Sequence, residues 1–220
     1  MAKTFTAVIF DLDGTLMDTS GEIATALERT FVELQLPVVP KAVVETLIGR
    51  GVPMLIERAL AKVGASHRQP AEVVHHFERH YERTVGTASV LYPGVVEALR
   101  LLRQRRMPMS VVTNKPRLFT EKLLAGLGIA DFFSAVVAGD DGIRRKPHGD
   151  MLLAACERMG SKPGATLMLG DSDNDITAAR EAGCHVWCVP YGYNEGRAPD
   201  TLRCDRLVAT LEEAAREISS

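Results

Sequence analysis

Two aspartates that directly follow a short apolar segment constrain this chain more than any other feature. Residues 7–10 read as a buried strand, and the sequence Asp-Leu-Asp-Gly-Thr-Leu follows at 11–16. Because ligands bind at the carboxyl ends of strands in open α/β sheets, Asp11 and Asp13 are expected at such an edge. Gly14 lets the backbone turn away from it. Two carboxylates at this spacing could bind one hard cation, and one of them could attack a substrate or move a proton.

The second half of the chain alternates between strand and helix patterns. Strands are predicted at 109–112, 135–138, 166–169 and 185–189, and helices at 95–105, 117–126, 150–159, 173–182 and 211–218. Strands that alternate with helices pair in parallel through right-handed crossovers. The sequence therefore predicts an α/β fold with a doubly wound parallel sheet.

The segment between the first strand and this alternating region has a different pattern. Apolar residues recur at helical spacing over 20–36, 41–48, 52–63 and 71–85, without a convincing strand among them. We interpret 19–86 as an inserted α-helical cap domain. Residues 1–18 and 87–220 would then form the core domain.

Polar residues follow four of the predicted strands in chain order. Asp11 and Asp13 come first, Thr113 and Asn114 follow the strand at 109–112, Lys146 precedes the helix at 150–159, and Asp171 and Asp175 follow the strand at 166–169. Each group alone is typical of an ordinary turn or helix cap. Together they are predicted to lie on one edge of one sheet, where Thr113 and Asn114 at a helix entrance could hold a phosphoryl group.

The charges of this set predict a cofactor. Asp11, Asp13, Asp171 and Asp175 cannot all be ionised close together without compensation. The ammonium of Lys146 and one Mg²⁺ would nearly neutralise them, and Mg²⁺ prefers such oxygen ligands.

Composition excludes several other functions. With 26 basic and 28 acidic residues, the formal net charge is −2, which argues against a nucleic-acid-binding surface. No apolar stretch approaches the ~18 residues of a membrane helix. Because the first predicted strand follows Met1 almost at once, no signal peptide is expected. Four cysteines without paired spacing favour free thiols, and hence a cytoplasmic protein. A phosphoryl group bound at the sheet edge would make the binding partner a small-molecule phosphate ester. The sequence does not indicate an oligomeric state.

The four strand-end motifs resemble those of the haloacid dehalogenase superfamily over essentially the whole chain. The resemblance implies that Asp11 is the nucleophile that forms an aspartyl-phosphate and that Asp13 is the acid and base. It also implies that Thr113 and Asn114 hold the phosphoryl oxygens and that Lys146 stabilises their charge. Mg²⁺ would be bound by Asp11, Asp171 and the backbone carbonyl of Asp13, with Asp175 at the edge of the metal site.

Asp13 further separates the reaction types within this superfamily. Members that cleave carbon–halogen bonds lack an aspartate at this position, because they need no acid for the leaving group. Asp13 therefore indicates a phosphatase or a phosphomutase.

Shorter strings narrow the resemblance to bacterial phosphoglycolate phosphatases. They are Leu-Ile-Gly-Arg-Gly at 47–51 in the cap, Val-Thr-Asn-Lys-Pro at 112–116 and Tyr-Gly-Tyr-Asn at 191–194. The family commonly has asparagine where this chain has Arg50. Because Arg50 lies between two glycines in a loop of the cap, it is a candidate partner for a substrate carboxylate; the alternative is an exposed loop residue. The predicted reaction is hydrolysis of 2-phosphoglycolate. The alternatives are a phosphatase for a sugar phosphate or nucleoside monophosphate, a phosphomutase, and a non-catalytic binding protein on the same fold.

Overall fold

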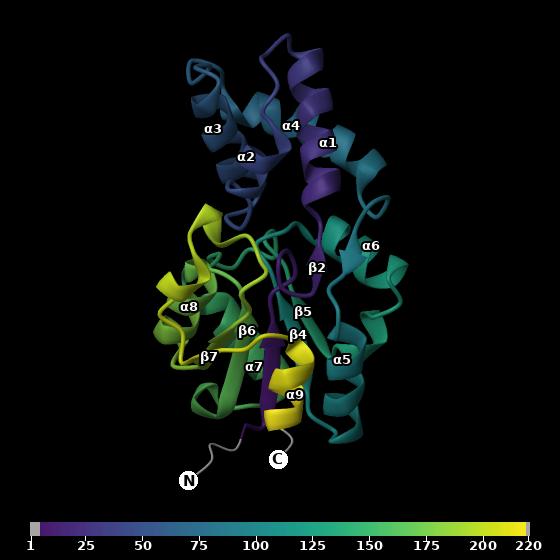
Figure 1. Cartoon of the computed structure of the whole chain (residues 1–220), viewed down its shortest axis with the longest axis vertical. Helices are drawn as coiled ribbons and strands as arrows, with labels where there is room; N and C mark the ends of the chain where they lie inside the picture. Colours follow the sequence, from purple (N-terminus) through teal and green to yellow (C-terminus); the bar gives the residue numbers. More distant parts are fainter. Residues whose placement is uncertain (1–4, 219–220) are drawn as a thin grey trace.

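A parallel sheet of six strands forms the centre of the protein (Figure 1). The computed structural model describes residues 5–218. The strand order is β5-β4-β1-β6-β7-β8, and each neighbouring pair is parallel. The strands are β1 (Ala7–Phe10), β4 (Met109–Val112), β5 (Ala135–Val137), β6 (Thr166–Gly170), β7 (His185–Cys188) and β8 (Arg206–Leu207). The predicted doubly wound α/β class is confirmed.

Helices cover both faces of the sheet, so its central strands are buried throughout. Along β1, Val8 and Phe10 belong to one apolar cluster, whereas Ile9 between them belongs to another. The first cluster includes residues of α5 (Val95–Gln104), α6 (Arg117–Gly126) and α9 (Leu211–Ile218). The second includes residues of α7 (Asp150–Met159) and α8 (Asp173–Ala182). Burial on both faces explains why β1 is a continuous apolar run and does not alternate with polar residues.

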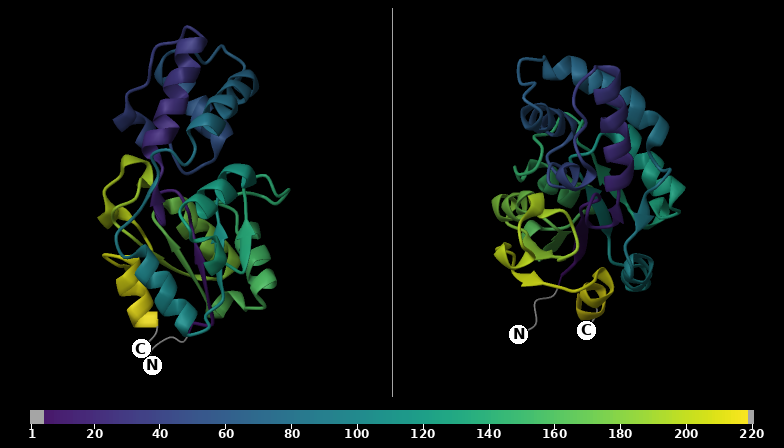
Figure 2. Two further views of the ribbon diagram at one scale, coloured as in Figure 1. Left: turned by 90° about the vertical axis from the view of Figure 1, so that its right-hand side faces the viewer. Right: turned by 45° about the horizontal axis from the view of Figure 1, so that its top comes forward.

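Four helices gather at one end of the molecule, above the carboxyl ends of the strands (Figures 1 and 2). They are α1 (Ser20–Glu33), α2 (Lys41–Glu45), α3 (Val52–Lys62) and α4 (Pro70–Thr84). Val73, Phe77 and Tyr81 recur every four residues on α4 and are buried, as expected for the apolar face of an amphipathic helix. The buried Tyr81 hydroxyl donates a hydrogen bond of 2.8 Å to Glu22 of α1. We refer to α1–α4 as the cap and keep its limits, 19–86, as a prediction.

A two-stranded antiparallel ribbon connects the cap with the sheet. It consists of β2 (Met17–Asp18) and β3 (Val90–Leu91), which flank the cap in the chain. The sequence did not predict β2, β3 or β8, because a strand of two residues is too short to show a periodic pattern. The predicted helix at 20–36 was also too long: it ends at Glu33, and Gln35 has a φ of 57°. Within residues 5–218, no helix is both long and apolar enough to cross a membrane.

Candidate active site

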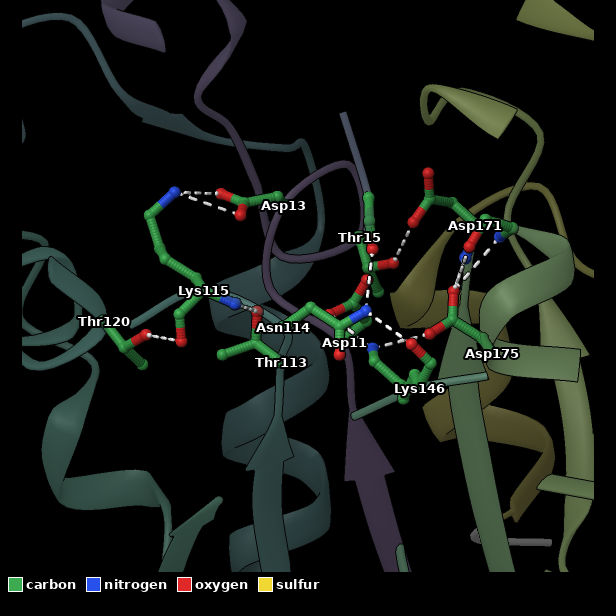
Figure 3. A network of polar contacts seen from close by, with 12 residues as sticks. Asp11, Asp13, Thr15, Thr113, Asn114, Lys115, Thr120, Lys146, Asp171 and Asp175 are labelled. Atoms are coloured by element: carbon green, nitrogen blue, oxygen red, sulfur yellow. Dashed lines mark hydrogen bonds and ion pairs between the residues drawn. The ribbon is translucent and has the colours of Figure 1, made fainter. Parts of the chain in front are cut away.

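The four polar groups that the sequence singled out meet at the carboxyl edge of the sheet (Figure 3). Asp11, Thr113 and Asp171 directly follow β1, β4 and β6, which are neighbours in the sheet. Lys146 reaches the same place from the loop before α7, and Asp175 from the first turn of α8. The topology thus brings together Asp11 and Asp175, which lie 164 positions apart in the chain. Both pair with Lys146.

Lys146 is a buried cation between two carboxylates. Only 3% of the residue is exposed, and its Nζ lies 2.8 Å from Asp11 Oδ1 and 2.7 Å from Asp175 Oδ1. The other oxygen of Asp175 accepts hydrogen bonds from the backbone N–H groups of Asp171 and Ser172 and from the Ser172 hydroxyl. Asp175 is therefore fixed at the start of α8, where its charge also favours the helix dipole.

The carboxylates of this cluster titrate abnormally. Burial raises the pKa of Asp11 well above its ordinary value, although the charge of Lys146 opposes the shift. Burial, together with the charge of Asp175, raises the pKa of Asp171 to about 7. Burial lowers the pKa of Lys146, but Asp11 and Asp175 outweigh this effect and the pKa lies above its ordinary value. The cluster therefore has more negative charge than Lys146 alone compensates.

A divalent cation would supply the missing positive charge. Carboxylate oxygens of Asp11, Asp171 and Asp175 all lie within 4.8 Å of one another. Asp171 is held in place by the Thr15 hydroxyl, which donates to Oδ1 at 2.9 Å, and by the Tyr193 backbone N–H, which donates to Oδ2 at 2.8 Å. This all-oxygen donor set fits Mg²⁺, which binds to one or two carboxylates and retains several waters.

The side chain of Asp13 lies apart from the three clustered carboxylates. Its Oδ1 accepts a hydrogen bond of 2.6 Å from the Thr19 hydroxyl, and Lys115 Nζ lies 2.8 and 3.0 Å from its two oxygens. The motifs of the sequence did not indicate a role for Lys115. Its place beside Thr113 and Asn114 was the one indication that it lies at the site, because its partner Asp13 is 102 residues away in the chain.

Thr113 and Asn114 lie at the site, with most of their polar atoms already bonded. The Thr113 hydroxyl accepts a hydrogen bond from the Lys115 backbone N–H at 3.2 Å. The Asn114 amide donates to the carbonyl of Gly49 in the cap at 3.0 Å and to that of Lys146 at 2.9 Å. Asn114 therefore joins the cap to the core here, and phosphoryl binding by these two residues stays a prediction.

The structure does not bring Arg50 together with the other candidate residues. Its Nε and Nη2 donate to the Glu195 carboxylate at 2.7 and 3.2 Å, and Arg58 of α3 donates to the same carboxylate at 2.9 Å. The Arg50 side chain is 43% exposed. Binding of a substrate carboxylate by Arg50 stays a prediction, and in this structure its guanidinium pairs with Glu195.

A loop at 191–197 contacts both the site and the cap. Besides the bond from its N–H to Asp171, Tyr193 donates its hydroxyl to Asp18 Oδ1 at 2.8 Å and accepts from the Thr19 backbone N–H at 2.8 Å. Two residues further on, Glu195 binds Arg50 and Arg58. One short loop therefore contacts the candidate metal site, the ribbon at β2 and the cap.

A cavity of about 470 Å³, its mouth included, lies between the cap and the carboxyl edge of the sheet. Asp11, Asp13, Thr113, Asn114 and Lys115 line it on the core side. The cap side is mostly apolar and is lined by Ile23, Ile48, Val52, Leu55, Phe77 and Tyr81, with Gly49 and Gly51 between them. A small substrate enclosed here would contact polar groups on one side and hydrocarbon on the other.

Comparisons with known proteins agree with this geometry. The family model for haloacid dehalogenase-like hydrolases matches residues 5–183. The chain is 42% identical over 217 residues to a phosphoglycolate phosphatase of Nitrosospira multiformis, covering 96% of this chain and 95% of that protein. It is 39% identical over 225 residues to the phosphoglycolate phosphatase of Escherichia coli K12, covering 94% and 89%. A crystal structure of a predicted phosphoglycolate phosphatase from Haemophilus somnus superposes with a TM-score of 0.88, at 30% identity over 96% of this chain and 97% of that one.

Proposed function

The chain belongs to the haloacid dehalogenase-like hydrolase family, and on this premise we propose that it hydrolyses 2-phosphoglycolate to glycolate and phosphate. The observation that supports the chemistry most directly is the separation of Asp11 from Asp13. Asp11 lies in the buried cluster with Lys146, whereas Asp13 is held outside it by Thr19 and Lys115. The substrate is proposed from the relatives that bear this name at about 40% identity.

In the first step, Asp11 would attack phosphorus while Asp13 gives its proton to the departing oxygen. A bond forms between an Asp11 oxygen and phosphorus, the bond from phosphorus to the glycolate oxygen breaks, and glycolate leaves as the alcohol. The ammonium of Lys146, 2.8 Å from Asp11, would stabilise the negative charge on the transferring group. In the second step, Asp13 takes a proton from water as the water oxygen attacks phosphorus, which releases phosphate and restores Asp11.

We propose Mg²⁺ as the cofactor, held by Asp11 and Asp171 with Asp175 at the edge of the site. When bound, the ion would neutralise charge between the nucleophile and the phosphoryl oxygens. In the form that accepts the proton from water, with Asp13 ionised, the charges balance: Asp11, Asp13, Asp171 and Asp175 contribute four negative charges, Lys115 and Lys146 contribute two positive ones, and Mg²⁺ contributes two more. Lys115 provides the positive charge that Lys146 and Mg²⁺ alone leave missing.

The apolar cap side of the cavity favours a small ester over a sugar phosphate or nucleotide. The six apolar side chains that line it offer no hydrogen bonds to sugar hydroxyls apart from the Tyr81 hydroxyl, which already donates to Glu22. Hydroxyls buried there would be left without partners, which costs binding energy. A phosphomutase acting on a hexose phosphate is disfavoured for the same reason. A cytoplasmic location, suggested by the free thiols, remains part of the proposal.

The decisive experiment measures phosphate release from a panel of esters in the presence of Mg²⁺. The panel contains 2-phosphoglycolate, several sugar phosphates and nucleoside monophosphates. We expect the highest kcat/KM for 2-phosphoglycolate and a loss of at least a thousandfold in kcat in Asp11→Asn. Asp131→Asn is the matched control, because Asp131 is exposed and lies near the opposite edge of the sheet. Higher activity on another ester would contradict the substrate, and phosphate release independent of Asp11 would contradict the mechanism.

A further inference from the structure

We infer that Lys115 is the residue that recognises the carboxylate of the substrate. This inference rests on the proposed function, because it assumes that the leaving group is glycolate. It assigns to Lys115 the role for which the sequence had suggested Arg50. Four observations about the cavity and the cations near it, Lys115, Arg50 and Lys146, support it.

Lys115 is the single cationic residue among the described residues that line the cavity. Its side chain is only 4% exposed. A carboxylate that enters a cavity with an apolar cap side loses its hydration, so it needs a cation within contact distance. The chain provides such a cation in Lys115.

The other two candidate cations are engaged elsewhere. Arg50 does not line the cavity, and its guanidinium binds Glu195 at the surface. Lys146 is held between Asp11 and Asp175 beneath the predicted phosphoryl position. Arg50 and Lys146 thus pair with carboxylates other than Asp13, whereas Lys115 pairs with Asp13 itself.

The position of Lys115 matches the length of 2-phosphoglycolate. Its Nζ contacts both oxygens of Asp13, which is the proposed proton donor to the bridging oxygen of the ester. In 2-phosphoglycolate, the carboxylate is separated from that oxygen by one methylene. A cation in contact with Asp13 is therefore beside the place that the carboxylate must occupy. A longer leaving group would bring its charge past Lys115 and against the apolar residues of the cap.

The ammonium also has a donor left for the substrate. It has three N–H bonds, of which two are used by the oxygens of Asp13. It lies 5.0 Å from the centre of the Tyr81 ring, and this ring also lines the cavity. The electron-rich face of Tyr81 favours the cation at this place. Lys115 is thus held in position before the substrate arrives.

The test compares two substrates that differ only in the recognised group. Ethyl phosphate has a methyl group where 2-phosphoglycolate has its carboxylate. We expect Lys115→Met to lower kcat/KM for 2-phosphoglycolate by about 10- to 100-fold more than for ethyl phosphate, the scale of one hydrogen bond to a charged group. Lys162→Met is the matched control, because Lys162 is exposed and precedes β6 at the opposite edge of the sheet.

The outcomes separate this inference from the proposed function. An equal loss on both substrates would mean that Lys115 only positions Asp13, and the inference would be wrong. If the wild-type enzyme itself does not prefer 2-phosphoglycolate to the other esters of the panel, the proposed function fails first. Should Lys115→Met not fold, product inhibition of the wild-type enzyme gives the answer. Glycolate should inhibit hydrolysis of ethyl phosphate at least tenfold more strongly than its uncharged amide, and equal inhibition would overturn the inference.

Discussion

Replacing Lys146 by methionine tests whether the buried charge cluster is held together by this one ammonium. The substitution keeps an unbranched side chain of similar length and removes the charge, so Asp11 and Asp175 lose their shared cation. Loss of one partner from a buried ion pair costs about 3–5 kcal/mol in the free energy of unfolding. That is a large share of the ~5–15 kcal/mol that stabilises a native protein.

The assay is urea denaturation at pH 8 in the presence of a chelator, so that no divalent cation replaces the lost charge. With a slope of ~3 kcal/mol per molar urea, the expected loss lowers the midpoint by about 1–1.7 M. Because burial already raises the pKa of Asp11, its protonation would relieve the repulsion in the variant. A carboxyl whose pKa is raised in the folded state destabilises that state at high pH, so the deficit of Lys146→Met should shrink as the pH falls from 8 toward 5.

A second substitution tests whether the charges of Lys146 and Asp175 are coupled. Asp175→Asn removes one of the two carboxylates that Lys146 compensates. In a double-mutant cycle, the two substitutions together should therefore cost at least ~1 kcal/mol less than the sum of the single losses. Additive losses, or a midpoint shift below about 0.3 M in Lys146→Met, would show that the ammonium does not hold the cluster together.

Three further outcomes follow from the site and the cap. Mg²⁺ at about 100 times its dissociation constant should add ~2.7 kcal/mol of stability, roughly 5–10 °C in melting temperature by calorimetry, and Asp171→Asn should abolish this rise. Gly192→Ala should raise the Mg²⁺ concentration needed for half-maximal phosphate release by about 10- to 100-fold. The reason is that a Cβ at this position would lie 2.2 Å from Asp171 Cβ and displace that carboxylate. An unchanged Mg²⁺ requirement would contradict this contact. The hydrogen bond from Arg79 lowers the pKa of Glu33 to about 2. The bond between Arg79 and Glu33 therefore stabilises the folded state above the unfolded pKa of ~4.3, and this stabilisation is lost as the pH falls toward 2. The urea midpoints of wild type and Glu33→Gln should accordingly differ at pH 6, differ less at pH 3, and converge only as the pH reaches about 2.

Those parts of the molecule that depend on local pattern could be predicted from the sequence. The helices at 117–126, 150–159, 173–182 and 211–218 have the predicted bounds, because their apolar faces and end signals lie within the segment itself. The positions of the candidate site residues at strand ends followed from the same pattern together with the parallel topology.

The contacts of individual side chains could not be predicted in this way. Lys115 and Asp13 are 102 residues apart, and Arg50 and Glu195 are 145 apart. Neither pair has a spacing that a periodic pattern could reveal, because each depends on how the cap and the loops lie over the sheet. Lys115, next to the predicted phosphate-binding pair, was therefore assigned no role. Arg50, which binds Glu195, was considered as a partner for the substrate carboxylate.

The loop at 191–197 has a consequence for how this protein can change in length. Surface loops ordinarily tolerate insertions and deletions, because few of their atoms have fixed neighbours. Here the Tyr193 N–H, the Tyr193 hydroxyl and the Glu195 carboxylate have partners in three different parts of the chain. Adding or removing one residue between Gly192 and Glu195 would break at least one of these attachments. This partly buried loop is therefore as intolerant of altered spacing as a strand in the middle of the sheet.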